Sequence, residues 1–174
     1  MTTNLHAAFR SGLVAGIWPL VVAGAAPAAA ADRLVTVGAA ESVRIYPGGL
    51  EMKARIDTGA TTSSINAQKI DRFNRNGKRW VRFEIVGKRG QRVTMERPVV
   101  RTVRIKRFGQ TSRRRSVVRI GVCLGSHYKD AQFTLQDRRR RKYPVLIGRR
   151  LMAGAVIVDP GREFVAQPNC PGHK

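Results

Sequence analysis

Short runs in which apolar residues alternate with polar ones recur along the chain. The clearest run is residues 79–86 (RWVRFEIV), where charged side chains alternate with apolar or aromatic ones. A period of two residues places one set of side chains on each face of a strand. Similar runs lie at residues 34–38, 41–46, 50–56, 91–95, 98–105, 113–124 and 131–136. Many short strands separated by turns predict an all-β barrel or sandwich.

Glycine-containing stretches mark the turns between these runs. Residues 74–78 (NRNGK) predict a hairpin turn, because Asn-Gly suits the backbone of tight hairpins. Residues 87–90 predict another turn, and residues 108–112 predict a polar tip between two strands. Residues 149–153 predict one helical turn, and residues 155–160 predict a last buried strand.

No strand–helix–strand rhythm, internal repeat or linker appears in the sequence. We therefore expect one folded domain over residues 32–165, followed by a tail at residues 166–174.

Residues 1–31 have the pattern of a signal peptide. Arg10 supplies the positive charge, residues 12–26 form an apolar run, and the alanines at 28–31 suit cleavage near Ala31. The apolar run is interrupted and short for a membrane span. We expect an exported mature chain without a transmembrane segment, periplasmic if the source is a Gram-negative bacterium. An uncleaved anchor is the alternative.

The chain is strongly basic, with 33 Lys and Arg against 11 Asp and Glu and a formal net charge of +22. Such an excess favours acidic partners, such as an acidic protein or an anionic envelope polymer. Aromatic residues make up only 6%, so the stacking side chains of a single-strand binder are scarce. Together with the export signal, this argues against nucleic acid as the partner. A solvated basic surface is the other interpretation of the same charge.

Cys123 and Cys170 are the only cysteines. Export permits a disulfide between them, but the sequence does not fix whether they lie close enough to bond. The alternative is a buried free thiol at Cys123, which falls in the strand-like run 113–124. The sequence leaves both open.

Residues 54–64 (ARIDTGATTSS) join an apolar, strand-like approach to a loop of small and hydroxyl residues. Asp57 is one of few acids in the chain, so a carboxylate here calls for a reason. Gly59 lets the backbone approach a neighbour closely, Thr58 can donate and accept hydrogen bonds, and Ala60 follows. The pattern predicts a carboxylate presented at the tip of a strand. An ordinary Asp-Gly turn is the alternative.

A second stretch, residues 143–152 (YPVLIGRRLM), makes the first more specific. Together the two resemble aspartic proteases of the retropepsin type, which carry Asp-Thr-Gly-Ala and, later, two apolar residues and Gly-Arg before a short helix. The resemblance implies that Leu146, Ile147, Gly148 and Arg149 brace the catalytic loop. It also implies a closed retropepsin-like β-barrel with one short C-terminal helix.

Two residues depart from the viral members of that family. Those enzymes carry acidic residues after Asp-Thr-Gly-Ala, and these acids engage the Arg of the Gly-Arg element. Thr61 and Thr62 occupy the positions here, so Arg149 has no acidic partner in the loop.

A single aspartate hydrolyses amides poorly, and aspartic proteases use two carboxylates that share one proton. This chain has one Asp-Thr-Gly, and residues 159–161 (DPG) do not repeat it. Retropepsins obtain the second carboxylate by homodimerisation. The resemblance therefore implies an endopeptidase in which Asp57 of each subunit activates a water. Thr58 would bond across the two-fold axis, and Gly59 would face the peptide substrate.

Over residues 37–160 the chain is similar to a bacterial branch of this family often labelled ATP-dependent zinc proteases. The matching pieces are residues 54–60, 63–67, 77–83, 115–118, 133–138 and 143–151. Some members of the branch lie near ATP-grasp proteins of the glutamate-ligase type.

The residues support neither half of that label. There is no Gly-rich phosphate loop and no His-Glu-x-x-His. His127 is the only histidine within the domain, and with Cys123 it does not make a zinc site. We expect no metal and no cofactor, with His127 in a surface loop. The alternative function is a weakly active or inactive binding module that holds an anionic polymer or an acidic protein on the same barrel.

Overall fold

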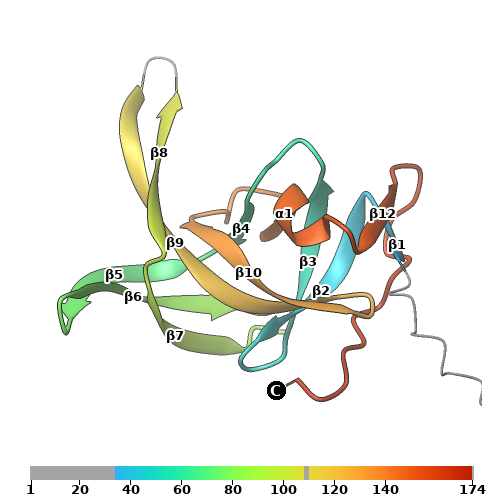
Figure 1. Cartoon of the computed structure of the whole chain (residues 1–174), viewed down its shortest axis with the longest axis horizontal. Coiled ribbons are helices and arrows are strands. Elements are labelled where there is room, and N and C mark those ends of the chain that lie inside the picture. Colours follow the sequence, from blue (N-terminus) through green and yellow to red (C-terminus); the bar gives the residue numbers. More distant parts are fainter. Residues whose placement is uncertain (1–33, 108–109, 174) are drawn as a thin grey trace, which may run out of the picture. The chain divides into compact units, whose positions relative to one another are not determined.

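The computed structural model describes residues 34–107 and 110–173 (Figure 1). The predicted signal peptide lies outside these residues, as does part of the predicted tip at 108–112. The elements in chain order are β1 (Val35–Gly38), β2 (Ala40–Tyr46), β3 (Leu50–Asp57), β4 (Ser63–Asn66), β5 (Gln68–Arg75), β6 (Lys78–Val86), β7 (Arg92–Pro98), β8 (Arg101–Arg107), β9 (Gln110–Leu124), β10 (His127–Gln136), β11 (Val145–Gly148), α1 (Arg149–Met152) and β12 (Val156–Asp159).

Six strands close into a barrel in the order β10, β4, β11, β3, β2 and β9, and β9 pairs with β10 to complete the ring. The prediction of a closed all-β barrel with one short helix near its C-terminal end is confirmed. Closure requires neighbours that are far apart in the chain, such as β11 in parallel beside β3.

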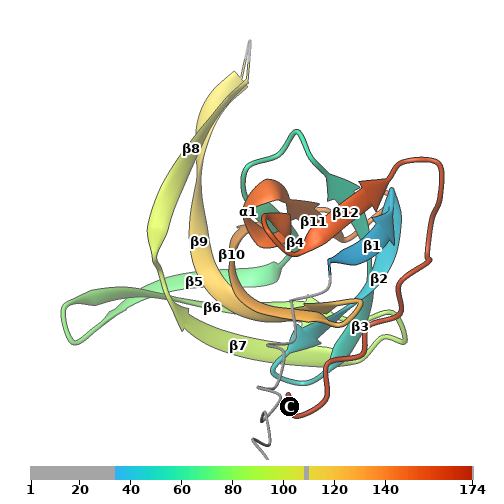
Figure 2. The ribbon, with the colours of Figure 1, turned by 45° about the vertical axis from the view of Figure 1, so that its right-hand side comes forward.

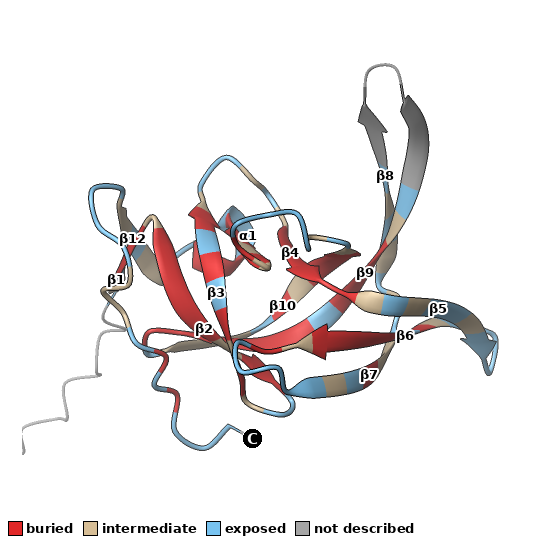
Figure 3. Cartoon of the chain, turned by 180° about the vertical axis from the view of Figure 1, so that it is seen from behind, coloured by how far each residue is buried: buried red, intermediate tan, exposed pale blue. Residues whose placement is uncertain are grey.

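The barrel core follows from the alternation in the sequence. In β3, Leu50, Met52, Ala54 and Ile56 point inward and are buried, whereas Lys53 and Arg55 are exposed. In Figure 3 buried residues are frequent along β2, β3 and the described part of β9, whereas β5 and β7 are far more exposed. Burial of such apolar side chains provides the main stabilisation of the barrel.

Two extensions leave the barrel. One is the three-stranded sheet of β5, β6 and β7, whose β5–β6 turn has positive φ at Asn76 and Gly77. This confirms the predicted hairpin turn. The other extension is the hairpin of β8 and β9, called the arm below, which projects from the barrel in Figure 1.

A two-stranded parallel sheet of β1 and β12 lies outside the barrel ring. Leu34 and Ile157 are about half exposed there, at 50% and 51%. The prediction of a buried last strand is therefore wrong, because Ile157 is exposed and Val156 and Val158 are only partly buried against the core. Within the described residues no helix is both long and apolar enough to cross a membrane.

The chain after β12 returns to the barrel. The buried carboxylate of Glu41 accepts hydrogen bonds from the backbone amides of Gly38 (2.6 Å), Val165 (3.2 Å) and Ala166 (3.1 Å). Cys170 forms a disulfide with Cys123 of β9. The segment predicted as a tail is thus attached to the barrel at least as far as residue 170.

Candidate active site

Asp57 is the last residue of β3, and its own loop fixes its side chain. Its Oδ1 atom accepts hydrogen bonds from the backbone amides of Gly59 and Ala60, both at 3.0 Å. The carboxylate is half buried, whereas Thr58 and Gly59 are exposed. The loop therefore holds the carboxylate in one orientation, while Thr58 and Gly59 at its edge are exposed to solvent.

The Gly-Arg element lies against this loop, as the resemblance implied. Gly148 pairs with Asp57 across the parallel β3–β11 ladder, and its amide donates to Ser63 Oγ at 3.1 Å. A Cβ at position 148 would lie 2.8 Å from the carbonyl oxygen of Ala60. Only glycine allows the two backbones to approach this closely.

Arg149 holds the loop through backbone oxygens. Its Nη1 atom donates to the carbonyl oxygens of Thr58 (3.1 Å) and Gly59 (3.0 Å), and its Nη2 atom donates to Thr61 Oγ1 (3.2 Å). Its amide donates to the carbonyl oxygen of Ala60 at 2.8 Å. In related enzymes an acid after Asp-Thr-Gly-Ala forms a salt bridge with this arginine. Here the several donors of the planar Arg149 guanidinium hold the loop through hydrogen bonds instead.

The two apolar residues before Gly148 have different surroundings. Ile147 is fully buried in the barrel core. Leu146 is half buried and lines a cleft that also reaches Asp57.

This cleft has a volume of about 650 Å³ and is strongly basic. Its other lining residues include six cations, namely Arg55, Arg115, Arg138, Arg140, Arg141 and Lys142. The acids in the lining are Asp57 and Asp137. A concave site of one sign concentrates ligands of the opposite sign, so the cleft is suited to a negatively charged ligand.

The pKa of Arg138 shows how the cations affect one another. Burial lowers the pKa of this guanidinium, and the positive charges of Arg141, Arg115 and Arg55 lower it further, while Asp57 opposes the shift. Arg138 stays in place because it donates to Ser64 Oγ (2.9 Å) and to the carbonyl oxygen of Tyr143 (3.2 Å).

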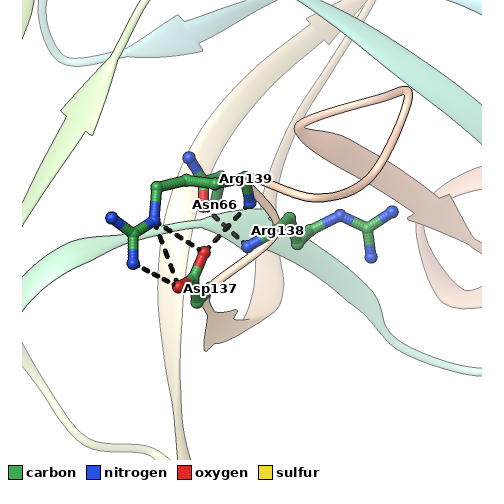
Figure 4. Close-up of polar contacts among 4 residues, drawn as sticks. All are labelled: Asn66, Asp137, Arg138 and Arg139. Atoms are coloured by element: carbon green, nitrogen blue, oxygen red, sulfur yellow. Dashed lines mark hydrogen bonds and ion pairs between the residues drawn. The ribbon is translucent and has the colours of Figure 1, made fainter.

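Asp137 lines the cleft, but its carboxylate is engaged by the neighbouring Arg139. Figure 4 shows its carboxylate facing Arg139, whose side chain donates to both carboxylate oxygens, the shortest bond being 2.6 Å. The guanidinium of Arg138 points the other way, and its backbone amide donates to Asn66 Oδ1 at 2.7 Å. Hydrogen bonds from Arg139 lower the pKa of Asp137 to about 2.

Comparison with known proteins identifies the family. The family described as "Retropepsin-like aspartic endopeptidase RimB" matches residues 36–169, most of the chain. The chain belongs to this RimB-like family. The resemblance drawn from the Asp-Thr-Gly and Gly-Arg motifs is confirmed, and the barrel is retropepsin-like.

Curated relatives carry the name "Probable alpha-L-glutamate ligase". The relative from Desulfotalea psychrophila is 38% identical over 63% of this chain and 24% of its own length. The relative from Shewanella pealeana is 36% identical over 71% of this chain and 26% of its own. The chain thus spans about a quarter of the length of these relatives.

A solved structure shares the fold. The crystal structure of Lpg0085 from Legionella pneumophila, a protein of unknown function, matches with a TM-score of 0.65 and 27% sequence identity. The match covers 76% of this chain and 98% of that one.

The sequence missed the cationic cleft as a site. Runs of basic residues are visible in the sequence at 113–115 and 138–142, but strand order decides that Arg115 from the first and Arg138, Arg140, Arg141 and Lys142 from the second line one cleft with Asp57. His127 was also placed wrongly, since it begins β10 and is half buried instead of lying in a surface loop. Within residues 34–107 and 110–173, no three His, Cys, Asp or Glu side chains gather as metal ligands would.

Proposed function

We propose that this protein is an exported aspartic endopeptidase that acts as a homodimer and cleaves acidic peptide segments. One observation carries the proposal: Asp57 is held in one orientation by two backbone amides at a cleft lined by six cations. Membership of the RimB-like family supports the peptidase chemistry.

The mechanism needs a second carboxylate that can hold a proton. Asp137 lines the same cleft, but hydrogen bonds from Arg139 lower its pKa to about 2 and keep it ionised. It is therefore unsuited to act as the protonated member of a pair. Asp57 of a second copy would supply the missing group by symmetry.

Two features support a second copy at this end of the molecule. Thr58 and Gly59 are exposed at the edge of the catalytic loop. Figure 2 shows α1, β12 and β1 on the same side as the β3–β4 loop, and Leu34 and Ile157 expose apolar surface there. Covering such surface is favourable, so a dimer would bring the two loops together and bury these side chains.

Within the dimer, the two amides occupy Oδ1 of each Asp57 and leave Oδ2 for the attacking water and the partner's carboxylate. The ionised member of the pair takes a proton from the water. The protonated member donates to the scissile carbonyl oxygen, and a proton then passes to the leaving nitrogen. The pair shares one proton, so it titrates as a unit.

The charge of the cleft selects the substrate. Carboxylates of an acidic peptide would pair with Arg55, Arg140 and Arg141 next to Asp57. A glutamate-containing peptide is the simplest acidic chain compatible with the ligase name of the relatives.

A subunit-mixing experiment tests the proposal. Wild type and Asp57→Asn are unfolded together, refolded at fixed total concentration, and assayed on acidic and basic peptides with and without chelator. If each site needs Asp57 from both subunits, activity follows the square of the wild-type fraction, so an equal mixture retains a quarter. A linear decline would show that each subunit acts by itself, and retention of about three quarters would show that one Asp57 suffices in a dimer; either result would contradict the proposed site.

A binding module on the same barrel remains the competing function, because a cationic cleft can hold an acidic chain without cutting it. In that case acidic peptides bind in a salt-sensitive way. The binding survives Asp57→Asn, and no cleavage occurs at any pH from acidic to neutral.

A further inference from the structure

A second basic groove lies on the other side of the arm. It has a volume of about 580 Å³ between the β5–β6 hairpin and the arm. Its lining includes four arginines and two aromatic residues, namely Arg72, Phe73, Arg79, Trp80, Arg104 and Arg114. We call this site the arm groove.

Strand alternation separates the arm groove from the cleft at Asp57. Arg114 and Arg115 are successive residues of β9, so their side chains leave opposite faces of the arm. Arg114 lines the arm groove, whereas Arg115 lines the cleft and donates to Gln136 Oε1. The arm is thus basic on both faces, and the two sites do not share these side chains.

The cations of the arm groove are not matched by acids. Among the described residues, none that lines it is acidic. Arg72 donates to Ser116 Oγ (3.1 Å) and Arg79 to Thr102 Oγ1 (3.5 Å), and a neutral hydroxyl leaves the positive charge uncompensated.

Several other arginines of the three-stranded sheet are paired with carboxylates. Glu96 pairs with both Arg75 and Arg82 at 2.6 Å. Glu84 likewise pairs with Arg92 at 2.7 Å. Arg75, Arg82 and Arg92, cations of this sheet outside the arm groove, therefore have carboxylate partners that those in the groove lack.

Arg104 and Arg114 stand directly opposite each other in the β8–β9 ladder. Like charges at such a position repel and weaken strand pairing. An anion bound between them would remove the repulsion, so we expect this pair to contact an anion bound in the arm groove.

Two chemistries could supply such an anion: carboxylates of a polypeptide or phosphates of a nucleic acid. A single-strand binder offers open ring faces for stacking bases. Phe73 and Trp80 are the only aromatic residues among the described lining, and the Arg75 guanidinium already lies over both rings, at 5.2 Å and 4.7 Å. The observations favour carboxylates.

We propose that the arm groove is a second, non-catalytic site that binds an acidic polypeptide segment. Bound there, an acidic chain is held on the far face of the arm from Asp57. This site is independent of the peptide-bond chemistry proposed above, because none of its lining residues belongs to the catalytic loop or the cleft.

Trp80 allows occupancy of the groove to be measured directly. The chain has two tryptophans, Trp18 and Trp80. In full-length protein carrying Trp18→Phe, the emission of Trp80 reports the groove alone. Asp57→Asn in the same protein prevents cleavage of the probe, a short peptide of alternating Glu and Gly. A Gln and Gly peptide is the neutral control.

We expect a saturable change in Trp80 emission with the Glu peptide and none with the Gln peptide. Arg104→Gln with Arg114→Gln should weaken binding about tenfold, since each exposed ion pair changes an affinity severalfold. Arg89→Gln with Arg162→Gln removes two charges at exposed positions elsewhere and should change binding by less than about twofold. Thr102→Glu, an added carboxylate in the groove, should also weaken binding.

Equal weakening in the two arginine pairs would mean attraction to net charge and would overturn the proposal. So would an unchanged Trp80 signal at saturating peptide. Tighter binding of a single-stranded oligothymidylate that displaces the peptide would assign the groove to nucleic acid instead. Because Asp57→Asn prevents cleavage of the probe, each of these binding results is independent of whether the peptidase proposal succeeds or fails.

Discussion

Two turns of this chain have nearly the same local structure and different surroundings. Asp57 and Asp159 each end a strand, and each pairs in parallel with a glycine, Gly148 and Gly38 respectively. In each turn Oδ1 accepts a hydrogen bond at 3.0 Å from the amide of the glycine two residues on.

The surroundings distinguish the two turns. Asp57 faces a cationic cleft, and the Arg149 side chain holds three oxygens of its loop. Asp159 ends a strand of the two-stranded sheet and is not part of that cleft. An Asp-x-Gly turn is therefore a common way to orient a carboxylate, and the neighbouring elements decide whether the carboxylate has a use.

The largest expected effect comes from replacing Asp57, with Asp159 as the matched control. Asp57→Asn should lower peptide cleavage about 10³-fold, because it removes the general base and its shared proton. Asp159→Asn should leave cleavage unchanged, since it keeps an oxygen for the turn. Initial rates on one acidic peptide give the comparison. Equal losses in both variants would show that the turn matters structurally and not chemically.

The paired glycines sharpen the comparison next. Gly148→Ala and Gly38→Ala both drive a Cβ into backbone atoms and should each lower the free energy of unfolding by about 1–3 kcal/mol. Urea unfolding measures this. Activity per folded molecule should fall only for Gly148→Ala, since only that clash displaces the Asp57 loop. An inactive but folded Gly38→Ala protein would contradict this.

The third difference between the two turns is the cationic cleft at Asp57. Arg140→Gln with Arg141→Gln should raise KM for an acidic peptide about tenfold and flatten its dependence on salt. Arg89→Gln with Arg162→Gln, with the same loss of net charge, should leave KM nearly unchanged. Steady-state kinetics at two salt concentrations decide between cleft-specific and general attraction.

Arg149 should have a smaller effect. Arg149→Lys keeps the charge but cannot span Thr58, Gly59 and Thr61, so we expect severalfold lower kcat and about 1 kcal/mol less stability. Arg162→Lys beside the other turn should change neither quantity. A variant Arg149→Lys with full kcat would show that the loop holds its own shape.

The smallest expected effect is a loss of stability at low pH. The pKa of Asp137 is lowered from 3.8 to about 2 by hydrogen bonds from Arg139, so the stabilisation from this pair is present above pH 3.8 and is lost as the pH falls towards 2. Carboxyl-carbon NMR should find a midpoint near pH 2, and Arg139→Gln should move it up towards 3.8. A midpoint near 3.8 in wild type would contradict the effect of Arg139 on this carboxyl group.

The sequence predicted what depends on local patterns. Alternation marked β3 and β6, and Asn-Gly marked the β5–β6 turn. The family resemblance carried by Asp-Thr-Gly and Gly-Arg implied that these two motifs meet, as they do where β11 pairs with β3. It did not predict the exposure of β12, because exposure depends on what packs over a strand. Nor did it predict that Arg55, Arg115 and Arg138 share one cleft, because three non-adjacent segments supply them.

The hydrogen bonds from Arg149 to the catalytic loop have a consequence for sequence variation among homologues. Two of its bonds end on carbonyl oxygens, which every amino acid provides, and a third ends on the Thr61 hydroxyl. An acid at position 61 or 62 is therefore not needed to hold the loop, and replacement of Thr61 costs only one of these three bonds. Homologues of this chain should vary more at 61 and 62 than at 148 and 149, where the geometry admits few replacements.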